Sequence, residues 1–197
     1  TKGQSATIFG VNDPATREDV VTFLWRYAGS PNPTQTTCTF KDVEAGQYYY
    51  NAILWANEEG IVNGYNADKF GVGDTCKRQD IVKIFWGYAG NEEAEDTTCE
   101  FTDVEAGQYY YPAVLWAVEN KITTGQTATT FGVGNACTRE QIVTFLWNYA
   151  GKPEPTKTEC TFKDVNPNHY YYKAMLWANE KGYVSGYNAD AFGVGDP

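Results

Sequence analysis

The sequence predicts an all-α fold of three helix–loop–helix units, with at most short β-strands, joined in a pseudo-threefold assembly. The chain repeats itself every 61 residues, so that Trp25, Trp86 and Trp147 occupy equivalent places. Each period holds two apolar segments of helical length, separated by a turn-rich loop. Six Trp, fifteen Tyr and ten Phe among 197 residues supply a shared core. Because one unit of this size buries little surface alone, we expect the units to pack against one another.

The first helix of each unit is expected to follow three consecutive tyrosines, at 48–50, 109–111 and 170–172. The three segments read YYYNAILWANEEG, YYYPAVLWAVENK and YYYKAMLWANEKG. Pro112 indicates where this helix starts, because proline is well tolerated only in the first helical turn. The tyrosines therefore belong at the N-terminal end of the helix.

The second helix of each unit is apolar around most of its circumference. Its three copies read VVTFLWRYAG, IVKIFWGYAG and IVTFLWNYAG. They end at Gly29, Gly90 and Gly151, which are expected to cap the C-terminal ends of the helices. A helix of this kind belongs at the centre of a bundle. Glycine, Asn and Asp residues in the intervening loop, as in VNGYNADKFGVGD, predict turns around one short strand at most.

The phase of the repeat predicts how the units are divided. Residues 1–14 align one for one with residues 184–197, so the chain begins and ends at nearly the same point of the period. We therefore expect a parent protein that continues in both directions. The predicted divisions are the second half of a unit at 1–37, whole units at 38–98 and 99–159, and the first half of a unit at 160–197.

The two half-units can be completed in two ways. Residues 15–29 can meet residues 161–183 of the same chain and close a ring. Alternatively, a second chain supplies the missing half, which would give a homo-oligomer through exchanged end half-units.

Composition excludes several classes of function. The net charge of -10 argues against nucleic acid as a partner, because phosphate binding needs clustered Lys and Arg. No apolar run reaches the roughly 18 to 20 residues that membrane insertion needs. His169 is the single histidine, and hydrolase, zinc-protease and P-loop motifs are absent from the sequence. We therefore predict a protein that is not an enzyme, with no catalytic residues, no cofactor and no metal site.

Five cysteines recur at alternating separations of 38 and 23 residues, which suggests disulfides and an oxidising location outside the cell. One register pairs Cys38 with Cys76 and Cys99 with Cys137, and leaves Cys160 over. The other pairs Cys76 with Cys99 and Cys137 with Cys160, and leaves Cys38 over. We favour the first register, because the end of the chain alone explains its unpaired cysteine.

Three short motifs recur in register. A Phe-x-Asp-Val element stands at 40–43, 101–104 and 162–165, and a glycine turn follows the Trp-containing first helix. The segments TRED, KRQD and TREQ open the second helix. With these motifs the whole chain resembles the S-layer homology (SLH) repeats of bacterial cell-surface proteins. It departs from the usual pattern at Val72 (usually Pro), Lys77 (Thr), Lys121 (Gly) and Gln141 (an acid).

The resemblance implies noncovalent anchoring of a secreted bacterial surface protein to the cell wall. The implied partner is an anionic secondary cell wall polysaccharide, often pyruvylated, which binds in grooves between repeats. The implied location is extracellular, at the cell surface. The competing hypothesis is a structural repeat that self-assembles or contacts other proteins.

Three of the chain's four arginines occupy one phase of the repeat, in the first turn of the second helix: Arg17, Arg78 and Arg139. A cation there opposes the helix dipole at a cost of about 0.3–1 kcal/mol, so an anion should compensate it. One alternative is an internal ion pair with the aspartate of the Phe-x-Asp-Val element. The other is an acidic group of a ligand, received by the arginine and the helix amides together.

The resemblance adds further candidate glycan contacts in each unit: Asp42, Asp103 and Asp164, Trp55, Trp116 and Trp177, and Gly64, Gly125 and Gly186. An indole on the first helix could stack on a sugar face, and packing in the core is the alternative. Trp25, Trp86 and Trp147 lie on the more apolar second helix and are predicted to be core residues.

Overall fold

The computed structural model describes residues 15–159 and 165–184. Within these ranges the chain forms six α-helices and no β-strand, apart from isolated β-bridges. The helices are α1 (Arg17–Tyr27), α2 (Tyr50–Glu58), α3 (Arg78–Tyr88), α4 (Tyr111–Glu119), α5 (Arg139–Tyr149) and α6 (Tyr172–Glu180). The prediction of an all-α, three-unit fold is confirmed. None of the helices in the described ranges has the length and apolar character to cross a membrane.

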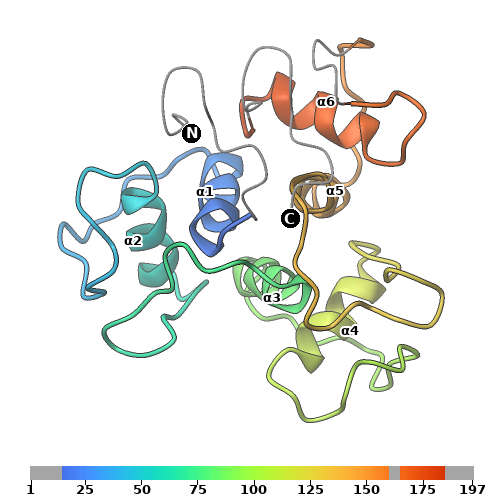
Figure 1. Ribbon diagram of the computed structural model, residues 1–197, viewed down its shortest axis with the longest axis horizontal. Helices are drawn as coiled ribbons and strands as arrows, with labels where there is room; N and C mark the ends of the chain where they lie inside the picture. Colours follow the sequence, from blue (N-terminus) through green and yellow to red (C-terminus); the bar gives the residue numbers. More distant parts are fainter. Residues whose placement is uncertain (1–14, 160–164, 185–197) are drawn as a thin grey trace.

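The helices are arranged in two rings around a pseudo-threefold axis (Figure 1). The inner ring consists of α1, α3 and α5, and the outer ring of α2, α4 and α6, each packed against one inner helix. The inner helices are the segments that are apolar around most of their circumference, so their central position follows the prediction. The core runs through all three units as one cluster of buried side chains.

The helix ends follow from local chemistry. Tyr50 is the first residue of α2, and Pro112 stands in the first turn of α4. Gly29, Gly90 and Gly151 follow the inner helices with φ of +87°, +85° and +83°, the left-handed conformation that favours glycine after a helix. The predicted helix starts and C-terminal caps are therefore confirmed.

Backbone bridges tie the starts of neighbouring inner helices together. The N–H of Arg17 donates to the carbonyl oxygen of Asp74 (3.0 Å), and the N–H of Arg78 donates to that of Asn135 (3.1 Å). At the opposite end of the helices, Tyr27, Tyr88 and Tyr149 meet edge to face, with ring centroids 5.9 to 6.3 Å apart. The inner ring is thus held at both ends.

The ring is closed within one chain. Tyr27 of α1 packs against Trp177 of α6 and against Tyr183, with centroid distances of 6.3 and 5.5 Å. Arg26 Nη1 donates to the carbonyl oxygen of Tyr183 (3.4 Å), just as Asn148 Nδ2, at the equivalent place, donates to that of Ile122 (2.8 Å). The predicted meeting of residues 15–29 with residues 161–183 is confirmed for their described parts.

The disulfide prediction is wrong for the described cysteines. Cys38, Cys76, Cys99 and Cys137 are free thiols, so neither register is formed there. Cys76 and Cys137 are buried where the inner helices are bridged, and the N–H of Cys137 donates to the carbonyl oxygen of Cys76 (3.2 Å). Cys38 and Cys99 are half-buried in the connectors between helices. Cys160 lies outside the described residues, and Cys137, its predicted partner in the second register, is one of the free thiols.

Candidate functional site

Among the described residues, two equivalent grooves open between neighbouring units, and they are called groove 1 and groove 2 below. Groove 1 has a volume of about 660 Å³, and its lining includes Arg17, residues 60–65, Lys77, Asp80, Lys83 and Tyr109. Groove 2 has a volume of about 690 Å³, and its lining includes Arg78, residues 121–126, Gln141, Lys152 and Tyr170. Because most lining positions are related by the 61-residue period, the repeat builds the same site twice.

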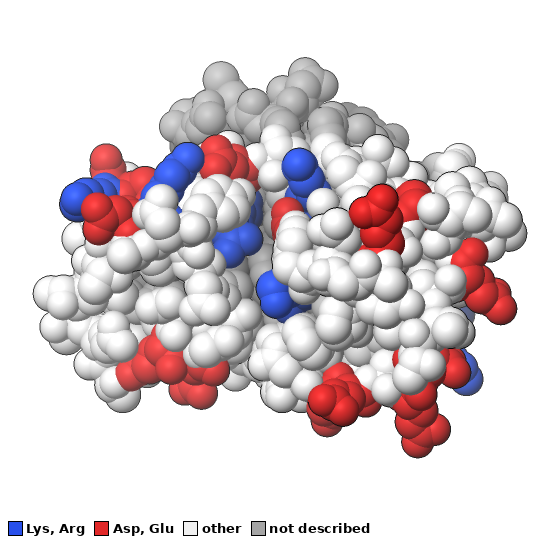
Figure 2. Space-filling view, turned by 90° about the horizontal axis from the view of Figure 1, so that it is seen from below, with Lys and Arg blue, Asp and Glu red and all other residues white. Residues whose placement is uncertain are grey.

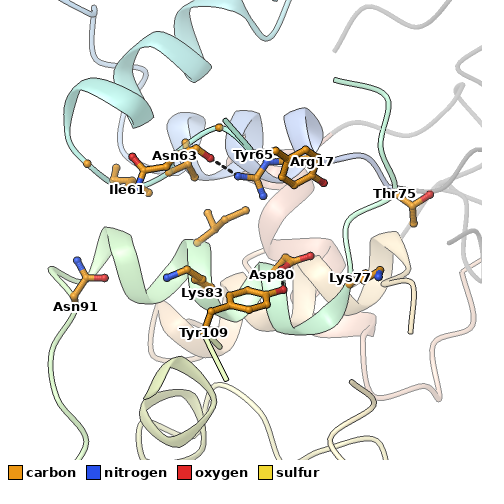
Figure 3. A pocket seen from close by; sticks show the side chains of 14 residues that line it. Arg17, Ile61, Asn63, Tyr65, Thr75, Lys77, Asp80, Lys83, Asn91 and Tyr109 are labelled. Carbon is orange, nitrogen blue, oxygen red and sulfur yellow. Dashed lines mark hydrogen bonds between the residues drawn. The ribbon is translucent and has the colours of Figure 1, made fainter. Parts of the chain in front are cut away.

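In groove 1, two walls face one another (Figure 3). Arg17, Asn63 and Tyr65 lie on one wall, and Asp80, Lys83 and Tyr109 lie on the other. Arg17 Nη2 donates to the carbonyl oxygen of Asn63 (2.6 Å), and its guanidinium lies 5.1 Å from the Tyr65 ring centroid. Arg17 Nε is buried with no hydrogen-bond partner among the described residues. The guanidinium therefore retains donor capacity beside an open groove.

In groove 2, Arg78 is the equivalent cation and is only 3% exposed. Its Nε donates to the carbonyl oxygen of Phe131 (2.9 Å), and its Nη1 donates to Gln141 Oε1 (3.3 Å). The guanidinium lies 5.1 and 4.9 Å from the ring centroids of Phe131 and Phe145. Burial lowers the pKa of the Arg78 guanidinium, because removal from water disfavours its charge. A nearby anion would restore that lost stabilisation.

The internal ion pair is wrong for the first two arginines. Among the described residues, neither Arg17 nor Arg78 forms a salt bridge. Arg139 is also buried, with its guanidinium 5.7 Å from the Phe23 ring centroid. The pairing predicted for it, with Asp164, lies outside the described residues. The direct contacts given above for the Arg17 and Arg78 guanidinium groups are thus with neutral acceptors and aromatic rings of the described residues.

The aspartates of the Phe-x-Asp-Val element hold loops instead. The carboxylate of Asp42 accepts the N–H groups of Phe70 (2.8 Å), Gly71 (2.7 Å) and Val72 (3.0 Å). Asp103 does the same for residues 131–133, at 2.8, 2.7 and 2.9 Å. Burial alone would raise the pKa of each carboxyl group, but the three backbone donors outweigh it and lower the pKa. Neither aspartate lines groove 1 or groove 2.

The backbone N–H groups at the start of the inner helices were predicted to receive an acidic group of a ligand. At the first helical residue they already form hydrogen bonds, since the N–H groups of Arg17 and Arg78 donate to the backbone bridges between inner helices. The start of α1 is set by Thr16, whose N–H donates to Asp19 Oδ2 (3.4 Å). Thr138 donates in the same way to Gln141 Oε1 (3.4 Å) at the start of α5. The arginine side chains, rather than these amides, therefore offer charge to the grooves.

The predicted turn glycines lie in the grooves. Gly64 lines groove 1 and Gly125 lines groove 2. A Cβ atom at Gly64 would stand 2.3 Å from Phe40 Cε1 and 2.6 Å from the carbonyl oxygen of Lys69. Gly125 has a φ of +85° and an equally close aromatic neighbour in Phe101, at 2.6 Å. Glycine is therefore required by space at both positions, while Gly186 lies outside the described residues.

Of the two possibilities for the first-helix tryptophans, the structure shows packing in the core, whereas the second-helix tryptophans, which were predicted to be core residues, are only partly buried. Trp55, Trp116 and Trp177 are only 6%, 2% and 3% exposed, so no indole face there is open to a sugar. They point inward from the outer helices, where each packs against a tyrosine of the central cluster. Trp25, Trp86 and Trp147 are half-buried, and their Nε1 atoms donate to the carbonyl oxygens of Pro31, Glu92 and Pro153 in the connectors.

The sequence analysis did not identify the lysines that line the grooves, and it assigned no binding role to the tyrosines. The first tyrosine of the second and third triplets lines a groove, as Tyr109 in groove 1 and Tyr170 in groove 2. Lysines come from different periodic positions in the two grooves, so the repeat gave no signal for them. Figure 2 shows Lys and Arg side chains beside the hollow near the middle of one face, although the whole chain is acidic.

Comparison with known families decides what kind of module carries these grooves. The sequence profile described as "S-layer homology domain" matches residues 39–82, 100–143 and 161–197, which is more than half of the chain. The chain belongs to the S-layer homology domain family. SLH domains attach proteins to the cell surface, and they are binding modules rather than catalytic domains.

One curated relative is similar to part of this chain. It is an endoglucanase of Bacillus sp. (strain KSM-635), with 30% identity over 98 residues. The match covers 50% of this chain and 10% of the endoglucanase. The similarity therefore concerns a small part of a much longer protein.

Proposed function

We propose that this chain anchors its parent protein to the bacterial cell wall by noncovalent binding of an anionic secondary cell wall polysaccharide in the inter-repeat grooves. The observation that carries the proposal is Arg78, a buried cation with no carboxylate partner among the described residues, beside a groove of about 690 Å³. A buried charge of this kind is costly unless an anion pairs with it. A carboxylate on the polymer, such as a pyruvate ketal, would supply that anion.

The proposed contacts divide into binding and positioning residues. Arg17 and Arg78 bind the acid, because a guanidinium can hold a carboxylate through two parallel hydrogen bonds. The turns at Gly64 and Gly125 leave room for the sugar. Asp42 and Asp103 position the loops behind the grooves, and we assign the same roles by repetition to Arg139, Asp164 and Gly186.

The division into units supports the same proposal. We infer that residues 1–37 and 160–197 are the two halves of one unit, with 38–98 and 99–159 as whole units. The contacts of Tyr27 with Trp177 and Tyr183 support this division, because they join the two end segments. We further propose that the module belongs to a larger secreted surface protein, in which any enzymatic activity lies in other domains.

Retention on purified wall sacculi tests the proposed function. We expect the chain to sediment with native sacculi and to stay in solution with sacculi whose secondary polymer has been stripped by acid. Replacement of both Arg17 and Arg78 by Gln should reduce retention at least about tenfold, since each change removes a charge-assisted contact. Lys41→Gln is the matched control, because Lys41 forms only an exposed ion pair with Asp68.

Two results would contradict the proposal. One is equal retention on stripped and native sacculi. The other is full retention by the double arginine variant, with a circular dichroism melt that shows it to be folded. Either result would favour the structural, self-assembling alternative, which needs neither the polymer nor the arginines.

A further inference from the structure

We propose that groove 2 is the tighter of the two described sites for an anionic saccharide, and that Gln141 is the residue that makes it so. This inference rests on the proposed function, and it concerns a difference between two copies of one site. Gln141 is the third residue of α5, and the equivalent residue of α3, in groove 1, is Asp80.

The two grooves differ in the charges of their lining residues. Each groove is lined by three cations, which are Arg17, Lys77 and Lys83 in groove 1 and Arg78, Lys121 and Lys152 in groove 2. Groove 1 also contains the carboxylate of Asp80, whereas the lining of groove 2 contains no acid. An anionic ligand therefore meets a lining carboxylate in groove 1 and none in the described lining of groove 2.

Glu140 stands next to Gln141 in the sequence but does not line groove 2. Its carboxylate accepts a hydrogen bond from Thr138 Oγ1 (2.6 Å), and the side chain is buried. The groove itself thus presents its three cations without a facing carboxylate.

The arginines of the two grooves differ in burial and in their side-chain contacts. In groove 2 the Gln141 amide oxygen accepts from Arg78 Nη1 and orients the guanidinium without neutralising it. Arg78 is nearly fully buried, so solvent and salt screen its charge less than that of the more exposed Arg17. A fixed, poorly screened cation gains more from an incoming carboxylate than a hydrated one does.

The tyrosine hydroxyls of the two grooves also differ in their hydrogen bonding. In groove 1 the hydroxyl of Tyr109 donates to Asp80 Oδ1 (2.5 Å), and Tyr48 donates in the same way to Asp19 (2.6 Å). Tyr170 of groove 2 is 62% exposed, and its hydroxyl has no hydrogen-bond partner among the described residues. A tyrosine hydroxyl has an ordinary pKa of about 10, so the Tyr170 phenol is a hydrogen-bond donor for a ligand at neutral pH.

A titration followed by nuclear magnetic resonance separates the two grooves in one molecule. The backbone N–H signals of Gly64 and Gly125 report on groove 1 and groove 2 respectively. The probe is a methyl hexoside carrying a pyruvate ketal, and the unmodified methyl hexoside is the neutral control. We expect the Gly125 signal to reach half-saturation at a probe concentration about tenfold lower than the Gly64 signal.

Reciprocal substitutions assign the difference to one position. Gln141→Glu should weaken binding of the ketal probe in groove 2 about tenfold or more, because the new carboxylate pairs with Arg78. Binding in groove 1 should not change. The new side chain is isosteric and can still accept the N–H of Thr138, so the fold should persist. Asp80→Asn should strengthen binding of the ketal probe in groove 1 several-fold and leave its binding in groove 2 unchanged. Gln141→Asn, which stays neutral, is the control and should weaken groove 2 much less than Gln141→Glu.

The outcomes distinguish this inference from the proposed function. Equal half-saturation of the two signals, or Gln141→Glu binding as tightly as the wild type, would overturn the ranking of the grooves but leave glycan binding intact. No shift of either glycine with the ketal probe would overturn both. Shifts of the same size with the neutral hexoside would show that charge does not drive binding, and would overturn the inference as well.

Discussion

Replacement of Asp42 by Ala should lower the free energy of unfolding by about 2–4 kcal/mol. Three backbone N–H groups, those of residues 70–72, lose their shared acceptor, which now binds them at 2.8, 2.7 and 3.0 Å. A hydrogen bond to a charged group contributes about 1.5–3 kcal/mol. The three are not additive, and water can reach this partly exposed carboxylate, so the expected sum is well below three times that value.

Urea unfolding followed by tryptophan fluorescence would measure the loss. Asp103→Ala should lose a similar amount, since the equivalent bonds are 2.8, 2.7 and 2.9 Å long. Asp96→Ala is the matched control, because Asp96 is exposed in a connector, and it should change stability by less than about 0.5 kcal/mol. A loss below about 0.5 kcal/mol for Asp42→Ala would refute the loop-holding role.

The same carboxylate predicts a pH dependence. The folded-state pKa of Asp42 is lowered, so its contribution is fully present above the unfolded value of about 3.9 and is lost as pH falls through the folded pKa. The stability difference between wild type and Asp42→Ala should therefore hold from pH 7 to about 5 and shrink below about pH 4. A difference that grows on acidification would contradict this sign.

Three further predictions concern space and accessibility. Gly64→Ala should lower the free energy of unfolding by more than about 2 kcal/mol, because the new Cβ atom would overlap a phenylalanine ring. Gly46→Ala has open space around it and should lower the free energy of unfolding by only about 1 kcal/mol, the strain of its left-handed backbone conformation. Urea unfolding of the two variants measures both losses. Cys99 should be alkylated by iodoacetamide at pH 8 long before Cys137, whose pKa burial raises to about 12, and equal rates by mass spectrometry would contradict this. Trp116→Ala should lower the free energy of unfolding by about 3–5 kcal/mol, since the indole is buried. A loss below about 1 kcal/mol would contradict the assignment of Trp116 to the core.

Features that depend on local chemistry could be predicted from the sequence. The 61-residue period showed which residues are equivalent, and Pro112 and Gly29 marked helix ends through their own backbone preferences. The segment with apolar residues on most sides had to be central. These inferences need no knowledge of how the helices are oriented.

Features that depend on the angle between helices could not be predicted. Both helices of a unit carry a tryptophan among apolar residues, and only the packing shows that Trp116 points inward while Trp147 lies under a connector. The partner of Asp42 could not be predicted for the same reason. Its carboxylate could accept either from Arg17 or from backbone N–H groups, and only the structure shows that it accepts from the backbone. The cysteine pairs predicted from spacing along the chain were wrong for the described cysteines, since spacing does not determine the distance between Cα atoms in space.

The contact of Tyr27 with the last helical unit has a consequence for the evolution of the chain. An open solenoid can gain or lose one repeat at its end, because each repeat touches only its neighbours. Here the first inner helix fills the place beside the last outer one, so a single additional 61-residue copy would have no vacant position to enter. Growth of such an array should proceed by whole sets of three, and loss of one copy should unfold the remaining two rather than shorten them.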